Sequence, residues 1–215
     1  HHEKCKMVRY PVAVEALRVL TEQMAPQFES EKSLAMTCSG VAKAGLNGPP
    51  WDELWRRLDD AAVAFAMGKS GGLSAQSLST IAWAFAKGGY RSEGALYDVL
   101  AGRVVAQLPV FSDHQLAQTA WAYATVAQSQ PQLFDALAAE ALPRVTEDFQ
   151  LHAMSNLCWA FAKTRHLAPK LFSAIAEQFT SRARGLTPQG MALTAWAFAA
   201  SKHEAQELFD ALATE

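Results

Sequence analysis

The chain has 215 residues, a mass of 23.4 kDa and a formal net charge of −2, from 19 Lys and Arg against 21 Asp and Glu. This length allows one globular domain or one short repeat array, and excludes a multidomain enzyme with its own cofactor fold. Half of the residues are hydrophobic and alanine alone makes up about a fifth. Such a composition is typical of closely packed helices, and the balanced charge announces no nucleic-acid partner by itself.

The cysteines and the apolar runs exclude further classes of protein. Cys5, Cys38 and Cys158 lie far apart without a CxxC pair, so we expect no disulfide framework, no structural zinc site and no cofactor. No apolar run approaches the roughly 18 residues that cross a bilayer, so we expect no membrane partner. The apolar helical pattern is still running at Leu208 to Glu215, which suggests a fragment of a longer protein.

The first elements follow one another without a long break. We expect residues 1–10 to form an N-terminal extension, and Pro11 to Met24 to be the second helix of an incomplete leading unit. The next predicted unit spans residues 31–66. Its first helix is at Leu34 to Gly45, and Leu54-Trp55 opens the second.

A repeat then dominates the chain. Trp-Ala-aromatic-Ala begins at Trp83, Trp121, Trp159 and Trp196, and a Leu-aromatic pair recurs with nearly the same period from Leu96 onward. Each unit therefore contains two helices, with units predicted at 73–107, 111–145, 149–184 and 186–215. The fold class is predicted as all-α. We expect residues 11–215 to form a single α-solenoid of about five 37–44-residue helix-turn-helix repeats plus the N-terminal half repeat.

Local chemistry predicts the helix boundaries. Ser74, Ser112 and Thr187 stand where an N-cap would satisfy the first free amides, and Gly88-Gly89 follows one Trp helix as a stop signal. Pro131 and Pro169 fall at the start of second helices, where the missing donor of proline costs nothing.

The first helix of each unit has two distinct faces when the Trp is set at zero degrees. Positions five before, two before and two after the Trp form the predicted core stripe, next to a ridge of small residues. Positions seven before, three before and four after it share the sector of the Trp, and we call them the polar stripe. From the first Trp unit to the last, the polar stripe holds Gln76, Thr80 and Lys87; His114, Gln118 and Thr125; His152, Asn156 and Lys163; and Gln189, Leu193 and Ala200.

Variable polar residues repeated once per unit suit a modular reader that contacts one ligand element per repeat. Amides and imidazoles hydrogen-bond base edges, and a lysine at a helix end meets phosphate. The candidate RNA-binding residues are Gln76, Thr80, Lys87, His114, Gln118, His152, Asn156, Lys163 and Gln189. Three other interpretations stay open: a solvated helix face, Trp residues that fill the space between repeats, and lysines that suit the helix dipole.

The remaining motifs argue against catalysis. Gly68-Lys69-Ser70 resembles the end of a phosphate-binding loop, but Val63 stands where that motif needs glycine. Stacking of repeats is expected to place His114 and His152 about 10 Å apart, too far to share a metal. The His1, His2 and Cys5 group is more typical of a flexible chain end than of a chelate. We predict that the protein is not an enzyme.

The repeat resembles the octotricopeptide repeat family and the related FAST-kinase-like and RAP-domain helical arrays. The resemblance rests on the unit length, on Leu-Ser-Thr-Ile-Ala-Trp-Ala-Phe-Ala-Lys at 78–87 and its variant at 154–163, and on one partial proline signature at Pro49-Pro50-Trp51. It implies an organellar protein, mitochondrial or chloroplast, that binds single-stranded RNA in RNA processing, stability or translation. Most units lack the proline signature, and no RAP-like domain is visible.

The alternative hypothesis is a protein-interaction scaffold. The neutral charge and the apolar richness favour a chain that docks protein subunits within a larger ribonucleoprotein, such as an organellar ribosome with its ribosomal RNA.

Overall fold

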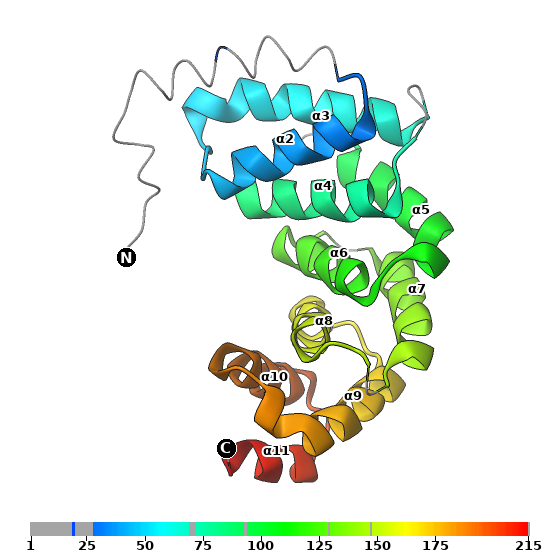
Figure 1. Cartoon of the computed structure of the whole chain (residues 1–215), viewed down its shortest axis with the longest axis vertical. Coiled ribbons are helices and arrows are strands. Elements are labelled where there is room, and N and C mark those ends of the chain that lie inside the picture. Colours follow the sequence, from blue (N-terminus) through cyan, green and yellow to red (C-terminus); the bar gives the residue numbers. More distant parts are fainter. Residues whose placement is uncertain are drawn as a thin grey trace. The chain divides into compact units, whose positions relative to one another are not determined.

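The computed structural model describes Val19 and residues 28–68, 72–92, 94–128, 130–146 and 148–214. Within that part it contains ten α-helices, labelled α2 to α11 in Figure 1, and four short 3-10 helices, without a strand. The all-α prediction is therefore confirmed. The predicted extension at 1–10 and the half repeat at Pro11 to Met24 lie outside the described residues, apart from Val19.

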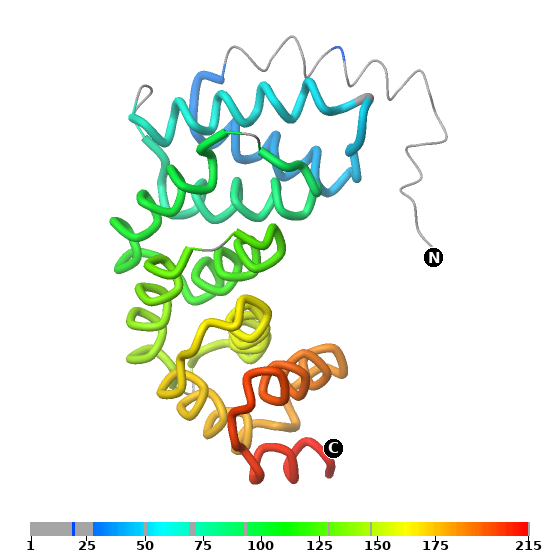
Figure 2. Tube along the Cα trace, turned by 180° about the vertical axis from the view of Figure 1, so that it is seen from behind, coloured from blue at the N-terminus to red at the C-terminus, as the bar shows by residue number. Residues whose placement is uncertain are grey.

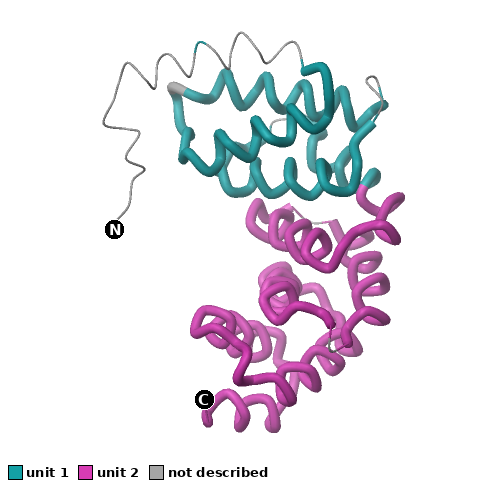
Figure 3. The backbone as a smooth tube through the Cα atoms, in the orientation of Figure 1, with its two compact units in different colours: residues 1–103 teal, residues 104–215 magenta. Residues whose placement is uncertain are grey.

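The chain divides into two compact units, residues 1–103 and 104–215 (Figure 3). The helices of unit 1 are α2 (Glu31–Lys43), η3 (Pro49–Trp51), α3 (Asp52–Ala66), α4 (Ala75–Gly88) and most of α5 (Leu96–Gln107). Helix α2 packs against both α3 and α4. The segment with the partial proline signature forms η3, directly before the second helix of its repeat.

Unit 2 holds three helix pairs. They are α6 (Asp113–Thr125) with α7 (Pro131–Ala141), α8 (Leu151–Thr164) with α9 (Pro169–Arg182), and α10 (Pro188–Ser201) with α11 (Gln206–Ala213). The 3-10 helices η4 (Leu108–Val110), η5 (Leu142–Arg144) and η6 (Ala183–Gly185) precede α6, α8 and α10. The first helices pack in the order α6, α8, α10, and α9 packs against α11 (Figure 2). Stacked helix-turn-helix repeats are thus confirmed; that all five form one continuous array stays a prediction.

The predicted boundary signals are confirmed. The hydroxyls of Ser74, Ser112 and Thr187 accept hydrogen bonds from the amide three residues on, at 3.3, 3.3 and 3.1 Å. Helix α4 ends at Gly88, and Gly89 closes it in the left-handed conformation with φ 69°. Pro131 and Pro169 are the first residues of α7 and α9.

The core stripe is also confirmed. The residues at its three positions in α4, α6 and α8 are all fully buried: Leu78, Ile81, Phe85, Leu116, Thr119, Tyr123, Met154, Leu157 and Phe161. In α10, Thr194 and Phe198 are buried and Met191 is half-buried. Cys38 and Cys158 are buried free thiols, and burial raises the pKa of both, so neither is a reactive thiolate at neutral pH.

Trp55 joins α3 to the end of α4. Its indole Nε1 donates to the carbonyl of Leu46 at 2.8 Å, and its ring stacks on Tyr90 with the ring centroids 6.0 Å apart. A Cβ atom added to Gly88 would lie 2.4 Å from Cζ2 of that ring. Only a residue without a side chain allows this close approach.

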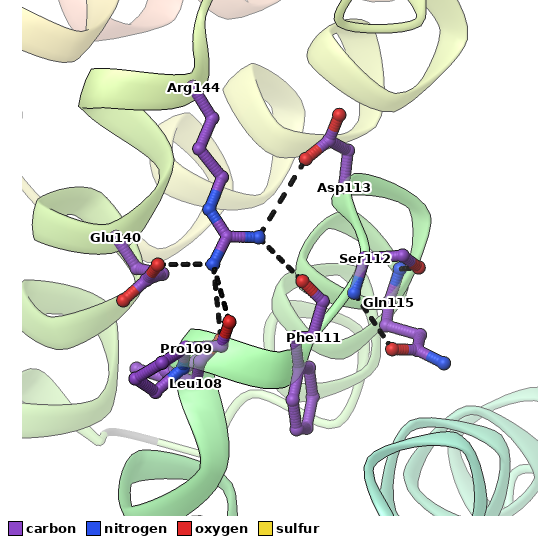
Figure 4. Close-up of polar contacts among 8 residues, drawn as sticks. All are labelled: Leu108, Pro109, Phe111, Ser112, Asp113, Gln115, Glu140 and Arg144. Carbon is purple, nitrogen blue, oxygen red and sulfur yellow. Dashed lines mark hydrogen bonds and ion pairs between the residues drawn. The ribbon is translucent and has the colours of Figure 1, made fainter.

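Two arginines at equivalent positions tie the end of a second helix to the loop that opens its own repeat. Arg144 donates to the carbonyls of Phe111, Leu108 and Pro109, and pairs with Glu140 (Figure 4). It also lies 3.9 Å from the carboxylate of Asp113.

Arg182 repeats this arrangement one unit later, where it donates to the carbonyls of Thr146 and Phe149 at 3.4 and 3.0 Å. The sequence separations match those of Arg144, at 36 and 33 residues. We call Arg144 and Arg182 the arginine clamps. Both guanidinium groups donate hydrogen bonds within the protein, so we assign them a structural role and not a part in ligand binding.

Asp59 gives a stability prediction for unit 1. This carboxyl is buried on α3, and its burial raises its pKa despite a hydrogen bond from Ser92. A carboxyl whose pKa is higher in the folded than in the unfolded state destabilises the fold as the pH rises above about 3.9, its unfolded value. Asp59→Asn is therefore expected to raise the melting temperature at neutral pH, with a gain that shrinks toward pH about 4.

The matched control for this prediction is Asp60→Asn, because the neighbouring Asp60 is exposed and pairs with Arg56 at 2.9 Å. Its effect should stay within about 0.5 kcal/mol. Calorimetry of both variants across that pH range is the measurement. A lower melting temperature for Asp59→Asn at neutral pH would contradict the expectation.

Candidate nucleic-acid interface

Unit 2 presents the polar stripe to solvent. His114, His152 and Gln189 are exposed and occupy the second position of α6, α8 and α10, while Gln118 and Asn156 are half-buried one turn further along. None of these five side chains has a hydrogen-bond partner within the described part of the chain. Lys163 is exposed in the last turn of α8. These predicted residues therefore share one face, with their polar groups free for a ligand.

The expected separation of the two histidines is wrong. The ring centroids of His114 and His152 are 5.8 Å apart, with the ring planes inclined by 55°. Packed helix axes are about 8–10 Å apart, but the two imidazole rings, each on the first turn of its helix, lie closer to each other than that. The described residues contain no group of three or more His, Cys, Asp or Glu suited to a metal ion.

The repeated tryptophans of unit 2 form a ladder along the polar stripe. The ring centroids of Trp121 and Trp159 lie 6.4 Å apart with planes inclined by 28°, and those of Trp159 and Trp196 lie 6.5 Å apart at 38°. Trp121 and Trp159 are half-buried, and Trp196 is 45% exposed. We call these three residues the Trp ladder. They do contact one another between repeats, and they also reach the surface.

Unit 1 carries the other three candidates on α4. Gln76 and Lys87 are exposed, Thr80 is half-buried, and the Gln76 amide donates to the Thr80 hydroxyl at 3.0 Å. In α2, Ser39 stands at the position that Trp occupies in the later repeats, and the ammonium of Lys43 lies 5.9 Å from the ring centroid of Trp83. A cation–π contact thus replaces the ring contact found between the repeats of unit 2.

Two cations at the ends of first helices, Arg165 and Lys202, were missed from the sequence, although Lys163 beside them was predicted. Arg165 and Lys202 take left-handed conformations, with φ of 56° and 54°, six residues after their Trp, and both are exposed. With Lys163 they form what we call the basic edge, and none of the three makes an ion pair within the described residues. Lys163 and Arg165 line a cavity of about 430 Å³ at the end of α8. Reading two positions beyond Lys163 would have found this row.

Two further histidines are structural. His166 and His203 follow the left-handed residues and pack on the ring pairs Phe134 and Phe161, and Phe172 and Phe198. The Nε2 atom of His166 lies 2.9 Å from a carboxylate oxygen of Asp135. These contacts join each first helix to a second helix.

Two of the sequence expectations concern a phosphate loop and a membrane helix. Gly68 follows the end of α3, while Lys69 and Ser70 lie outside the described residues. Among the helices described, none has the length and apolar character to span a bilayer.

Comparison with known proteins gives one family. The family model described as RNA-editing substrate-binding complex 6 protein matches residues 8–215. The chain therefore belongs to that family. No curated protein matches the chain.

Proposed function

We propose that this member of the RNA-editing substrate-binding complex 6 protein family binds single-stranded RNA along the polar stripe of unit 2. One observation carries the proposal: at equivalent positions of successive first helices, the half-buried amides of Gln118 and Asn156 make no hydrogen bond within the described residues. The family description, which names an RNA-editing substrate, supports the same ligand.

The two halves of the polar stripe have different tasks in this proposal. Amides and imidazoles bond base edges, and the basic edge of Lys163, Arg165 and Lys202 meets the phosphates. A net charge of −2 is compatible with this arrangement, because the three cations at the ends of α8 and α10 make no ion pair with any residue that the structure describes. We extend the proposal to Gln76, Thr80 and Lys87 as a second group, in unit 1.

The test of base reading is a binding titration of the full chain with selected and random single-stranded RNA. Combined Gln118→Ala and Asn156→Ala substitutions are expected to weaken the selected RNA by about 1–3 kcal/mol and the random RNA much less. Glu177→Ala on α9 is a matched control, since this side chain is exposed on a second helix. Equal losses for both RNAs would contradict base reading by these amides.

The basic edge gives a second prediction. Substitution of Lys163, Arg165 and Lys202 by alanine should reduce the slope of log affinity against log salt by about 2, since each phosphate contact on a single strand contributes about 0.7. Titrations between about 50 and 200 mM salt measure the slope. Lys170→Ala, on the exposed surface of α9, should leave it unchanged. An unchanged slope for the triple variant would show that these three side chains do not contact the phosphates.

We further propose that the chain works as a binding subunit, without catalysis, in an assembly that processes organellar RNA. The family description names a complex that binds an editing substrate and does not name a ribosome, so an editing assembly is the partner we favour. Nothing in that description supports the chloroplast, and we propose a mitochondrial location. The resemblance to octotricopeptide repeat proteins also supports recognition of RNA by successive repeats.

Affinity purification with and without nuclease distinguishes RNA binding from the alternative, a protein-interaction scaffold. Loss of all bound partners after nuclease treatment would indicate that RNA holds them. A protein subunit that stays bound after nuclease treatment would support the scaffold.

A further inference from the structure

We propose that the Trp ladder forms two slots, between Trp121 and Trp159 and between Trp159 and Trp196, and that each slot takes one unstacked nucleobase. This inference rests on the proposed function, because the ligand is the same single-stranded RNA. The ring centroids are 6.4 and 6.5 Å apart. A planar base in van der Waals contact with two flanking rings needs them about 7 Å apart, twice a contact of about 3.5 Å. The inclined rings, which now contact one another, therefore have to part and turn parallel for a base to enter between them.

The Trp ladder lies on a different face of the first helices from the side chains that pack in the core. They lie in the sector of the polar stripe, with Trp196 45% exposed, while the core side of each first helix is filled by other side chains. Within the described residues, no acceptor receives a hydrogen bond from the indole N–H of Trp121, Trp159 or Trp196. The buried Trp55 differs, since its N–H donates to the carbonyl of Leu46. The indole N–H groups of the ladder lie on half-buried or exposed side chains, where a ligand can reach them.

The Trp rings and the amides beside them have different parts in RNA binding. Gln118 and Asn156 precede Trp121 and Trp159 by three residues and lie on the same face. Stacking on an indole is tolerant of base identity, because every base has a π-face, whereas an amide beside the slot bonds a particular base edge. We therefore assign binding strength to the Trp ladder and sequence preference to the two amides.

The test compares a short single-stranded RNA with an abasic ribose-phosphate strand of the same length. RNA is expected to quench the tryptophan fluorescence of the full chain and the abasic strand is not. Trp159→Leu, which removes the ring shared by both slots, should weaken RNA binding by roughly 5- to 100-fold. Trp196→Leu, which removes one slot, should weaken it less, and Trp159→Phe should restore part of the loss. Val110→Ala, exposed in η4, is the control and should bind as the parent does.

Helix content measured by circular dichroism establishes that the variants fold. If Trp159→Leu does not fold, the proposal is tested by the RNA affinity of Trp196→Leu and by the response of the unaltered chain to the abasic strand. Tighter binding of RNA than of the abasic strand, without quenching and without a loss in Trp196→Leu, overturns the slots and leaves base reading by the polar stripe standing. Equal affinity for the two strands overturns both. Absence of any RNA binding overturns both proposals.

Discussion

Replacing Arg144 by alanine is expected to lower the free energy of unfolding of the chain by about 2–4 kcal/mol. The substitution removes the Arg144 donor from the carbonyls of Phe111 and Pro109, leaves the Leu108 carbonyl with the Phe111 N–H alone, and breaks the ion pair of Glu140. The Arg144 side chain is only 24% exposed there. Hydrogen bonds to a charged donor are stronger than neutral ones, and half-buried acceptors lose more when that donor is removed. Chemical denaturation followed by circular dichroism measures the loss.

The second arginine clamp and the basic edge provide matched comparisons for that result. Arg182 donates to two carbonyls, so Arg182→Ala should cost about 1–2 kcal/mol. Arg165 is exposed and makes no ion pair in the described part of the chain, so Arg165→Ala should leave stability within about 0.5 kcal/mol while it weakens RNA binding. Below its melting temperature Arg144→Ala should keep the RNA affinity of the parent. Equal destabilisation by Arg144→Ala and Arg165→Ala would refute the clamp.

Gly88→Ala is expected to destabilise unit 1 by about 3 kcal/mol, at the upper end of overpacking costs. The added methyl group would meet the Trp55 ring at 2.4 Å, and that ring is 1% exposed with its N–H held by Leu46. The ring cannot move aside without breaking this hydrogen bond and its stacking on Tyr90. Near-ultraviolet circular dichroism during urea unfolding reports on the packing of the ring and on stability.

Gly40→Ala is the control, because Gly40 also lies within a helix but a Cβ there would have nothing within 4 Å. Alanine favours a helix over glycine by about 0.8–1.0 kcal/mol, so this variant should be more stable than the parent. If both variants shift stability in the same direction and by the same amount, helix propensity and not the Trp55 contact governs Gly88.

Much of the site was predictable because its determinants are local. The period of Trp83, Trp121, Trp159 and Trp196 and the caps at Ser74, Ser112 and Thr187 gave the correct helices. Setting those helices at 100° per residue then predicted which side chains are buried. The exposure of His114 and His152 agrees with that face. Whether they bind RNA stays a prediction.

Three features were not predictable from helical periodicity. The separation of His114 and His152 depends on how far two side chains lean toward each other, which the axis spacing of packed helices does not give. The clamp of Arg144 joins residues 33 and 36 positions apart, so no helical period shows it. The basic edge includes Arg165 and Lys202 because left-handed residues at the helix ends extend the row beyond the last turn.

The amino-acid sequence by itself determined the helices, their ends and the face that each first helix turns to solvent, since hydrogen bonding and periodicity act within a few residues. Only the tertiary structure decided the spacing of the Trp ladder, the contact of the two histidines and which arginines donate hydrogen bonds within the protein. Those distances are set by the packing of one repeat on the next, where side chains from distant parts of the chain share the same space.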